Sequence, residues 1–195
     1  MAYVATRWGS MCGGSLISKE WVITAAHCVG SGNPADIRVD LGQHDLFSAT
    51  EAVLVRKYLS EVHIHPDWDS QTLSNDVALL KLEQPLDFSQ ISHVRPICLP
   101  TGSENFEGSA AKVAGWGMTS TSTGTSRVLL EADVTVLTNS ECKATGHRPS
   151  NIKDSMICAK GDGDTGACKG DSGYENTNFY KHNSVICRGS LDGTK

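Results

Sequence analysis

The sequence predicts an all-β protein, and three observations support this fold class. Its apolar residues mostly follow a period of two or fall in short runs, which is typical of strands rather than helices. Gly, Pro, Asn and Ser interrupt these runs at intervals close to the roughly 8–12 residues expected of a sandwich or barrel. Helix signals are few. We therefore expect short antiparallel strands, joined by turns, around a hydrophobic core.

The candidate strands, in chain order, are residues 10–17, 21–24, 37–41, 52–64, 77–82, 111–116 and 128–137. The last of these alternates most clearly, since the residues at 132, 134 and 136 are apolar and those at 131, 133 and 135 are polar. This predicts a half-buried strand. Only two segments indicate helical turns: residues 25–28, and residues 138–142, where capping residues precede a short helix.

Length and charge narrow the class of protein. The 195 residues suit one or two domains, and a candidate boundary lies at 100–108, where Gly and polar residues interrupt the strands. A net charge of −5 with no basic stripe disfavours a nucleic-acid-binding protein, because phosphate binding needs clustered cations. No apolar run approaches the roughly 18 residues of a membrane helix. We expect neither nucleic acid nor membrane as a partner.

Seven cysteines without a C-x-x-C pair favour disulfides in an oxidising compartment over a zinc or redox site. The chain starts without the basic and apolar regions of a signal peptide. We therefore expect a secreted protein whose signal peptide is absent from this chain.

Three segments carry the residue types needed for nucleophilic acyl transfer. His27 follows a predicted strand in a tight turn, Asp76 immediately precedes an apolar strand, and Ser172 lies between glycines whose backbone N–H groups can converge on an oxyanion. Each of these segments also has a purely structural, non-catalytic interpretation. A single histidine in such a turn is more often structural, an aspartate before a strand is usually a turn cap, and Gly-Asp-Ser-Gly alone is commonly a loop.

Taken together with the cysteines, these segments change the interpretation, because from Met1 to Gly173 the chain resembles the chymotrypsin-like (trypsin-like) serine proteases. The motifs that carry the resemblance are CGGSLI (12–17), WVITAAHC (21–28), NDVALLKL (75–82), VRPICLP (94–100), AGWG (114–117), MICA (156–159) and CKGDSG (168–173). The resemblance implies two antiparallel β-barrels with the second incomplete, and an extracellular serine endopeptidase. The implied units are residues 1–103, with His27 and Asp76, and 104–195, with Ser172 and an anomalous tail from 174, together forming one peptidase domain.

The resemblance also implies the role of each site residue. Ser172 is the expected nucleophile, His27 the general base, and Asp76 the group that orients the imidazole. The backbone N–H groups of Gly170 and Ser172 are the expected oxyanion hole. Gly166, followed by Ala167, stands where a trypsin-like member carries an aspartate. The resemblance therefore points to a preference for apolar residues, like that of chymotrypsin or elastase.

The disulfides implied by the resemblance are Cys12 with Cys28, Cys142 with Cys158, and Cys168 with Cys187. Cys98 matches a position that bonds to a propeptide in many members, so a propeptide is an expected partner, together with protein or peptide substrates and serine protease inhibitors. No metal or cofactor is expected. Gln43 stands where calcium-binding members carry a glutamate, and His63 and His65, on one predicted strand face, lack a third ligand nearby.

The resemblance fails at both ends of the chain. Members begin with an Ile-Val-Gly-Gly-like segment whose α-amino group pairs with the aspartate before the nucleophile, here Asp171, and they continue with Gly-Pro where this chain has Tyr174. We therefore expect a chain truncated at both ends: a truncated or alternatively spliced product, or a mis-assembled gene model, in which a foreign tail follows Gly173. The alternative to an active enzyme is a catalytically inactive homologue that acts by binding only, or a non-functional fragment.

Overall fold

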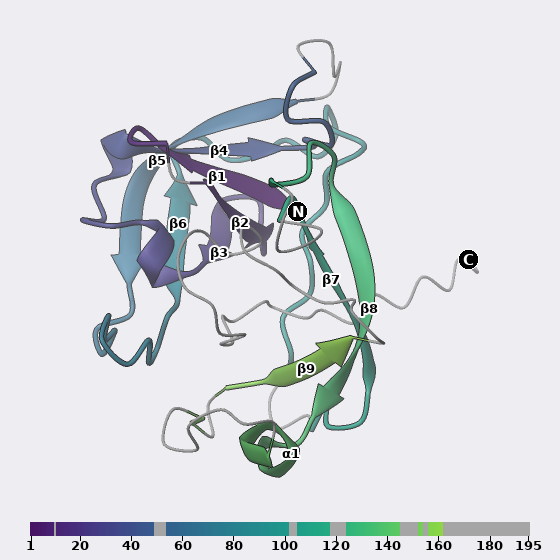
Figure 1. The fold of residues 1–195 in the computed structure, drawn as a ribbon. Helices are drawn as coiled ribbons and strands as arrows, with labels where there is room; N and C mark the ends of the chain where they lie inside the picture. Colours follow the sequence, from purple (N-terminus) through teal and green to yellow (C-terminus); the bar gives the residue numbers. More distant parts are fainter. Residues whose placement is uncertain are drawn as a thin grey trace.

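The computed structural model describes residues 1–9, 11–48, 54–101, 105–117, 124–144, 152–153 and 156–161. Within these residues the protein consists of a closed β-barrel and a second, three-stranded sheet (Figure 1). This confirms the all-β class and agrees with a chymotrypsin-like two-barrel architecture, in which the described part of the second barrel is an open sheet.

The first barrel closes in the strand order β1-β2-β3-β6-β5-β4, and every neighbouring pair is antiparallel. Its strands are β1 (Ala2–Thr6), β2 (Met11–Leu16), β3 (Trp21–Thr24), β4 (Ile37–Leu41), β5 (Val55–Ile64) and β6 (Ala78–Leu82). A closed barrel of this kind pairs the backbone groups that would otherwise lie along open edges. The barrel therefore supplies a rigid frame for the loops that leave its strands.

Alternate side chains of the strands fill the barrel, so the period of two seen in the sequence becomes an inside and an outside face. The largest fully buried side chains include Val4, Val22 and Leu80. Gly14 lies where strands approach closely: a Cβ placed there would lie 3.0 Å from the Ile23 carbonyl oxygen and 3.1 Å from a Val22 methyl group. A side chain at position 14 would therefore force the strands apart.

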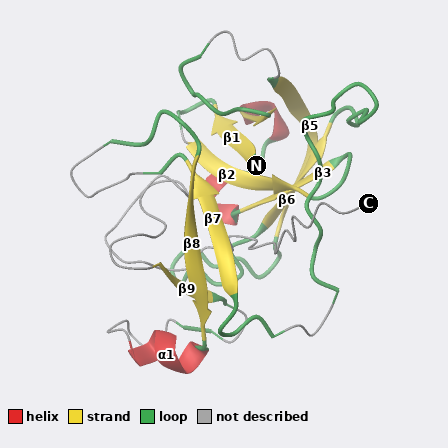
Figure 2. Cartoon of the chain, turned by 90° about the vertical axis from the view of Figure 1, so that its right-hand side faces the viewer, coloured by secondary structure: helices red, strands yellow, loops and turns green. Residues whose placement is uncertain are grey.

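The second sheet has the order β7-β8-β9, again antiparallel, with β7 (Ala110–Gly115), β8 (Leu130–Leu137) and β9 (Cys158–Gly161). Val134 and Val136 are buried while Asp133 and Thr135 are exposed, as the alternation predicts. Helix α1 (Asn139–Ala144) follows β8 at the end of the sheet far from the barrel (Figure 2).

A capping box begins α1. Thr138 Oγ1 accepts a hydrogen bond from the Glu141 N–H at 3.0 Å, and Glu141 Oε2 accepts one from the Thr138 N–H at 2.8 Å. The predicted helix start is therefore confirmed. The turn predicted at 25–28 is also present, as the 3₁₀ turn η1 (Ala26–Cys28), and a second one, η2 (Pro34–Asp36), precedes β4.

Two strands escaped prediction, and several predicted bounds differ from the structure. β1 (AYVAT) and β9 (CAKG) are short and rich in Ala, Lys or Gly, which are depleted in strands. The strand predicted at 128–137 begins at Leu130, because the backbone around Val128 instead pairs with Asp45 of the first barrel. The strand predicted at 52–64 begins at Val55, and residues 52–53 lie outside the described part of the chain.

The described residues contain two disulfides, one in the first barrel and one joining α1 to the second sheet. Cys12 on β2 is bonded to Cys28 of η1, and Cys142 of α1 is bonded to Cys158 on β9. Cys98 is exposed. Cys168 and Cys187 lie outside the described residues.

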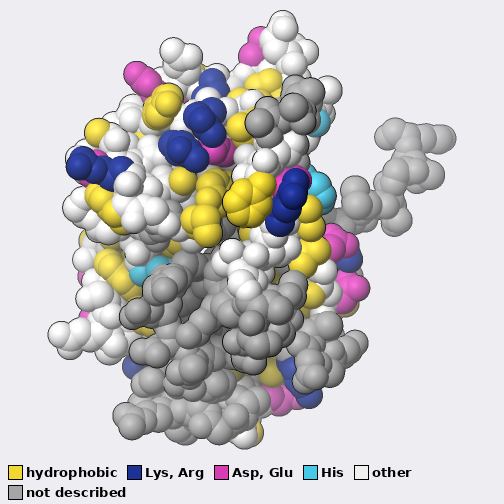
Figure 3. Space-filling view, turned by 45° about the horizontal axis from the view of Figure 1, so that its top comes forward, with side chains coloured by type: hydrophobic (Ala, Val, Ile, Leu, Met, Phe, Trp, Pro, Cys, Tyr) yellow, Lys and Arg dark blue, Asp and Glu magenta, His cyan; other side chains and the backbone are white. Residues whose placement is uncertain are grey.

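On the face shown in Figure 3, basic side chains are scattered among apolar and acidic ones. The ion pairs of the first barrel and its surroundings include Arg7 with Asp36 at 2.9 Å, Arg56 with Asp40 at 2.8 Å, and Arg127 with Asp45 at 2.7 Å. Among the described residues, no helix is both long enough and apolar enough to cross a membrane.

Candidate active site

His27 lies on η1, immediately after the barrel strand β3. Its neighbours Ala26 and Cys28 are buried, and the turn is closed by hydrogen bonds from the Cys28 N–H to the Ala25 carbonyl and from the Val29 N–H to the Ala26 carbonyl. The His27 side chain is 19% exposed. Burial of the flanking residues therefore anchors the turn and leaves the imidazole at the barrel surface.

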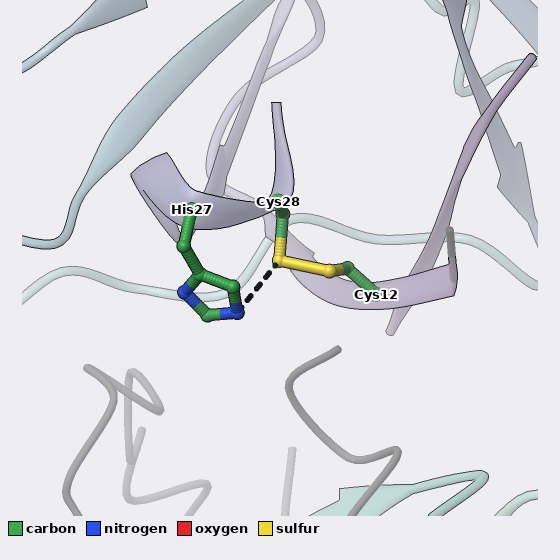
Figure 4. A group of neighbouring side chains, drawn as sticks. All are labelled: Cys12, His27 and Cys28. Carbon is green, nitrogen blue, oxygen red and sulfur yellow. Dashed lines mark hydrogen bonds between the residues drawn. A yellow bond between two sulfur atoms is a disulfide. The ribbon is translucent and has the colours of Figure 1, made fainter. Parts of the chain in front are cut away.

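The Cys12–Cys28 disulfide fixes this turn to strand β2. Figure 4 shows the imidazole beside the disulfide, with Cys28 Sγ 3.4 Å from Nε2 of His27. Although Cys12, His27 and Cys28 cluster closely enough to suggest a metal site, both sulfurs are in the disulfide and offer no thiolate. The cluster therefore restrains the histidine and does not have the donors of a zinc site.

Asp76 lies two residues before β6, in a loop whose conformation is set by its own polar groups. Asn75 has a φ of 57°, a left-handed conformation that asparagine tolerates better than most residues, and its side-chain amide donates to the Asp67 carbonyl at 2.8 Å. Leu73 also has a positive φ, of 55°, which is uncommon for a leucine. These contacts turn the chain so that Asp76 is buried, with 3% of its side chain exposed.

The barrel brings His27 and Asp76 together although they are 49 positions apart. Strands β3 and β6 are neighbours, and Thr24 is paired with Ala78 at the end from which both loops leave. One Asp76 oxygen accepts a hydrogen bond from the His27 backbone N–H at 2.9 Å. The other lies 2.7 Å from His27 Nδ1.

This geometry assigns the proton on the neutral imidazole. An ionised carboxylate only accepts hydrogen bonds, so Nδ1 carries the hydrogen that Asp76 binds, and Nε2 is the basic nitrogen. The buried carboxylate also favours a positive charge on the ring, because the two groups are in contact and largely withdrawn from water. The arrangement can therefore accept a proton at Nε2 and stabilise the resulting imidazolium.

The other predicted site residues lie outside the described part of the chain. These are the expected nucleophile Ser172, the expected oxyanion-hole residue Gly170, and the expected pocket residues Gly166 and Ala167. Of the three residues expected to form the catalytic group, the structure describes His27 and Asp76, and it brings them into contact.

His63 and His65, the other candidate metal ligands, do not share a strand face as expected. β5 ends at Ile64, so His65 lies beyond it, and its Nδ1 accepts a hydrogen bond from the Asp67 N–H at 3.1 Å. His63 is exposed and lies 2.7 Å from Glu61, whose pKa is lowered by hydrogen bonds from Lys81 and from His63. The two histidines therefore take part in separate interactions.

Gln43, at the position of the calcium-binding glutamate, uses its side-chain amide as a donor. Nε2 hydrogen-bonds the Asp45 carbonyl oxygen at 2.7 Å. The side-chain amide of Gln43, whose oxygen would have to be the calcium ligand, is thus held in a hydrogen bond through its nitrogen.

Sequence reasoning missed one long-range structural feature: the pairing of residues 44–46, which follow β4, with residues 127–129, which precede β8. The two segments are more than 80 positions apart, and no local pattern in either one predicts the contact.

Comparison with known proteins agrees with this geometry. The family model described as Trypsin matches residues 1–173. The chain is 36% identical over 167 residues to the serine proteinase stubble of Drosophila melanogaster, an alignment that covers 83% of this chain and 21% of that protein. This protein therefore belongs to the trypsin family of serine proteases. It spans about a fifth of the length of that relative.

Proposed function

We propose that this protein is a serine endopeptidase that hydrolyses peptide bonds through an acyl-enzyme, with Ser172, His27 and Asp76 as its catalytic residues. The observation that carries the proposal is the two-point contact of His27 with Asp76, at 2.7 Å through the ring and 2.9 Å through the backbone. A buried carboxylate that binds Nδ1 leaves Nε2 as the base, which is the arrangement that serine activation needs.

In the proposed reaction, His27 Nε2 takes the proton of the Ser172 hydroxyl as its oxygen attacks the carbonyl carbon of the substrate. The backbone N–H groups of Gly170 and Ser172 stabilise the oxyanion that forms. The imidazolium then gives its proton to the leaving amine, and the C–N bond breaks to leave an acyl-serine. Water then attacks the ester carbonyl carbon as the same Nε2 takes its proton. The imidazolium returns that proton to the Ser172 oxygen as the C–O bond breaks, which releases the acid and free Ser172.

Asp76 acts through His27 and does not touch the substrate. Because the His27 backbone N–H holds one carboxylate oxygen in place, the other oxygen stays directed at Nδ1, and the imidazole cannot rotate without losing that second hydrogen bond. The negative charge also lowers the free energy of the imidazolium that forms during both proton transfers. Asp76 therefore sets the tautomer and the orientation of the base.

Gly166 and Ala167 make an apolar substrate preference the better proposal for the specificity pocket. Neither residue can neutralise a buried lysine or arginine side chain, and burying an unpaired cation is costly. We infer a preference for cleavage after apolar residues, as in chymotrypsin or elastase.

The two units of the proposed peptidase domain are residues 1–103 and 104–195, with the catalytic residues divided between them. Proteins or peptides are the proposed substrates, serine protease inhibitors are proposed binding partners, and Cys98 is the proposed link to a propeptide. Two disulfides in the described residues support secretion, because such bonds persist in oxidising compartments.

Peptide hydrolysis tests the proposal and its specificity. We expect the purified chain to cleave peptides after Leu or Phe faster than after Arg, and its Ser172→Ala variant to be reduced to background. Faster cleavage after Arg would contradict the apolar pocket while leaving the endopeptidase intact. No cleavage by a chain with the circular dichroism of a folded β protein would favour an inactive homologue that acts by binding.

A further inference from the structure

The barrel and the second sheet meet along a seam formed by residues 44–47 and 127–129. The Leu46 N–H donates to the Arg127 carbonyl at 2.9 Å, and the Leu129 N–H donates to the His44 carbonyl at 2.8 Å. Asp45 and Val128 form an antiparallel bridge between them. The upper ends of β7 and β8 lie beside the barrel at this level (Figure 1). The seam is thus a small ladder that joins the two units.

A bidentate ion pair closes the seam. Arg127 Nε and one terminal guanidinium nitrogen each lie 2.7 Å from a different oxygen of Asp45, across 82 positions of sequence. The guanidinium also lies 5.9 Å from the centre of the Phe47 ring. Two parallel hydrogen bonds restrict both the distance between the two side chains and their relative rotation. The pair therefore fixes the orientation of the two segments more firmly than a single charge contact would.

Trp116 provides a second attachment beside the ion pair. It follows β7, is 4% exposed, and donates from its ring nitrogen to the His44 carbonyl at 2.9 Å. Its ring meets that of Tyr3 on β1 edge to face, with centroids 5.5 Å apart. The His44 carbonyl therefore accepts two hydrogen bonds, one from the Trp116 ring N–H and one from the Leu129 backbone N–H.

The position of this seam matters because the proposed catalytic residues belong to different units. His27 and Asp76 are held by the barrel, whereas Ser172 follows the second sheet in sequence. Proton transfer needs near-contact geometry, and a misplacement of about 1 Å can lower a rate by up to about 100-fold. The distance between base and nucleophile then depends on how firmly one unit is held against the other.

We propose that Asp45 and Arg127 are a positioning pair, which sets the second unit against the barrel and thereby places Ser172 relative to His27. The proposal rests on the proposed function for its catalytic consequence and on the seam alone for its structural part. Neither residue contacts substrate in this scheme. Removing the pair should loosen the seam and lower the acylation rate constant of Ser172. The affinity of the initial, non-covalent complex with a probe should stay unchanged.

The test compares Asp45→Asn, Arg127→Gln and the double variant with the parent chain. The matched control is Asp133→Asn, which removes a carboxylate that pairs with Lys112 at 2.9 Å within the second sheet. Hydrogen exchange at the Leu46 and Leu129 amides, followed by NMR, reports the seam without any need for activity. A fluorophosphonate probe reports the maximal acylation rate constant and the half-saturating probe concentration separately.

We expect exchange at both amides to be about tenfold faster in each seam variant and unchanged in the control. We expect the acylation rate constant to fall about tenfold in the seam variants with little change in half-saturating concentration. The acylation rate constant and the exchange protection of the double variant should be lowered no more than those of either single variant, because each single substitution already breaks the pair.

Exchange rates equal to those of the control, or additive losses in the double variant, would overturn the proposal. If the seam variants exchange faster but are acylated as fast as the parent, the positioning role is wrong. A parent chain that is not acylated at all contradicts the proposed function instead. The exchange result then still decides whether the pair holds the seam.

Discussion

His27 and Asp76 contact each other at two points, through the imidazole Nδ1 at 2.7 Å and the backbone N–H at 2.9 Å, although 49 positions separate them. The contact follows from the pairing of β3 with β6, because the two loops leave the barrel from the same end. One carboxylate thus holds both the ring and the main chain of the histidine. The base is positioned by the barrel itself, before any substrate binds.

Replacing Asp76 with asparagine should nearly abolish acylation while preserving the fold. The amide can present its NH₂ group to Nδ1 and so favour the wrong tautomer of His27. We expect kcat to fall by about 10⁴-fold, the size of the effect of this change in a chymotrypsin-like protease. Asp87→Asn, at an exposed turn where the Asp87 carboxylate accepts hydrogen bonds from the Ser89 N–H and hydroxyl, is the matched control and should leave kcat unchanged. Equal activity of both variants would contradict the role of Asp76.

Loss of the Cys12–Cys28 disulfide should lower stability, because the bond closes a loop between positions 16 apart. For a loop of about 15 residues the expected cost is about 3 kcal/mol of unfolding free energy. Urea unfolding of the Cys12→Ser, Cys28→Ser double variant measures it. A free energy of unfolding within error of the parent value would show that the turn carrying His27 does not depend on the bond.

Gly14→Ala should destabilise the first barrel, since the added Cβ would lie 3.0 Å from the Ile23 carbonyl oxygen. We expect a loss of about 1–3 kcal/mol, as in other overpacked sites. Gly124→Ala is the matched control, because a Cβ there has no neighbour within 4 Å. Thermal unfolding of both variants checks this, and a similar melting temperature for the two would contradict the close packing at position 14.

The Asp45–Arg127 pair should lose its effect on stability in acid. Hydrogen bonds from Arg127, with one from the Phe47 N–H, lower the pKa of Asp45 to about 2. An unfolded aspartate has a pKa of about 3.9. Because the folded-state pKa is the lower one, the stabilisation is complete above about pH 4 and is lost as the pH falls toward 2.

The melting temperature of Asp45→Asn should therefore lie below that of the parent near neutral pH, with the difference disappearing at about pH 2. Differential scanning calorimetry over this range measures both. A difference that is the same at both pH values would show that the charge of Asp45 does not stabilise the fold.

Local pattern predicts much of the first barrel, and long-range pairing explains what it misses. The strands at Trp21–Thr24 and Ile37–Leu41 have the predicted bounds, because the first is a continuous apolar run and the second alternates between apolar and charged residues. β1 (AYVAT) and β9 (CAKG) have the same lengths, but Ala, Lys and Gly, which are depleted in strands, weaken their local signal. The predicted start of β8 is wrong because Val128 pairs with Asp45, which follows β4 of the first barrel, a contact that neither segment reveals alone.

In the candidate site, too, local sequence predicts the residues and long-range pairing determines how they meet. Its motifs name His27 and Asp76, but their contact depends on which strands become neighbours in the barrel. The turn at Asn75 depends on its amide reaching the Asp67 carbonyl, a contact made only once the loop has folded. Residue types and spacing therefore indicate the chemistry, and the strand order creates the geometry.

Fluorophosphonate labelling, with identification of the modified residue, shows whether Ser172 is a nucleophile activated by His27. We expect a single adduct on Ser172 in the folded chain, absent from Ser172→Ala and strongly slowed in His27→Ala. A folded parent chain that forms no adduct on Ser172, or forms one at the same rate without His27, would contradict the assignment of this protein as an active serine endopeptidase.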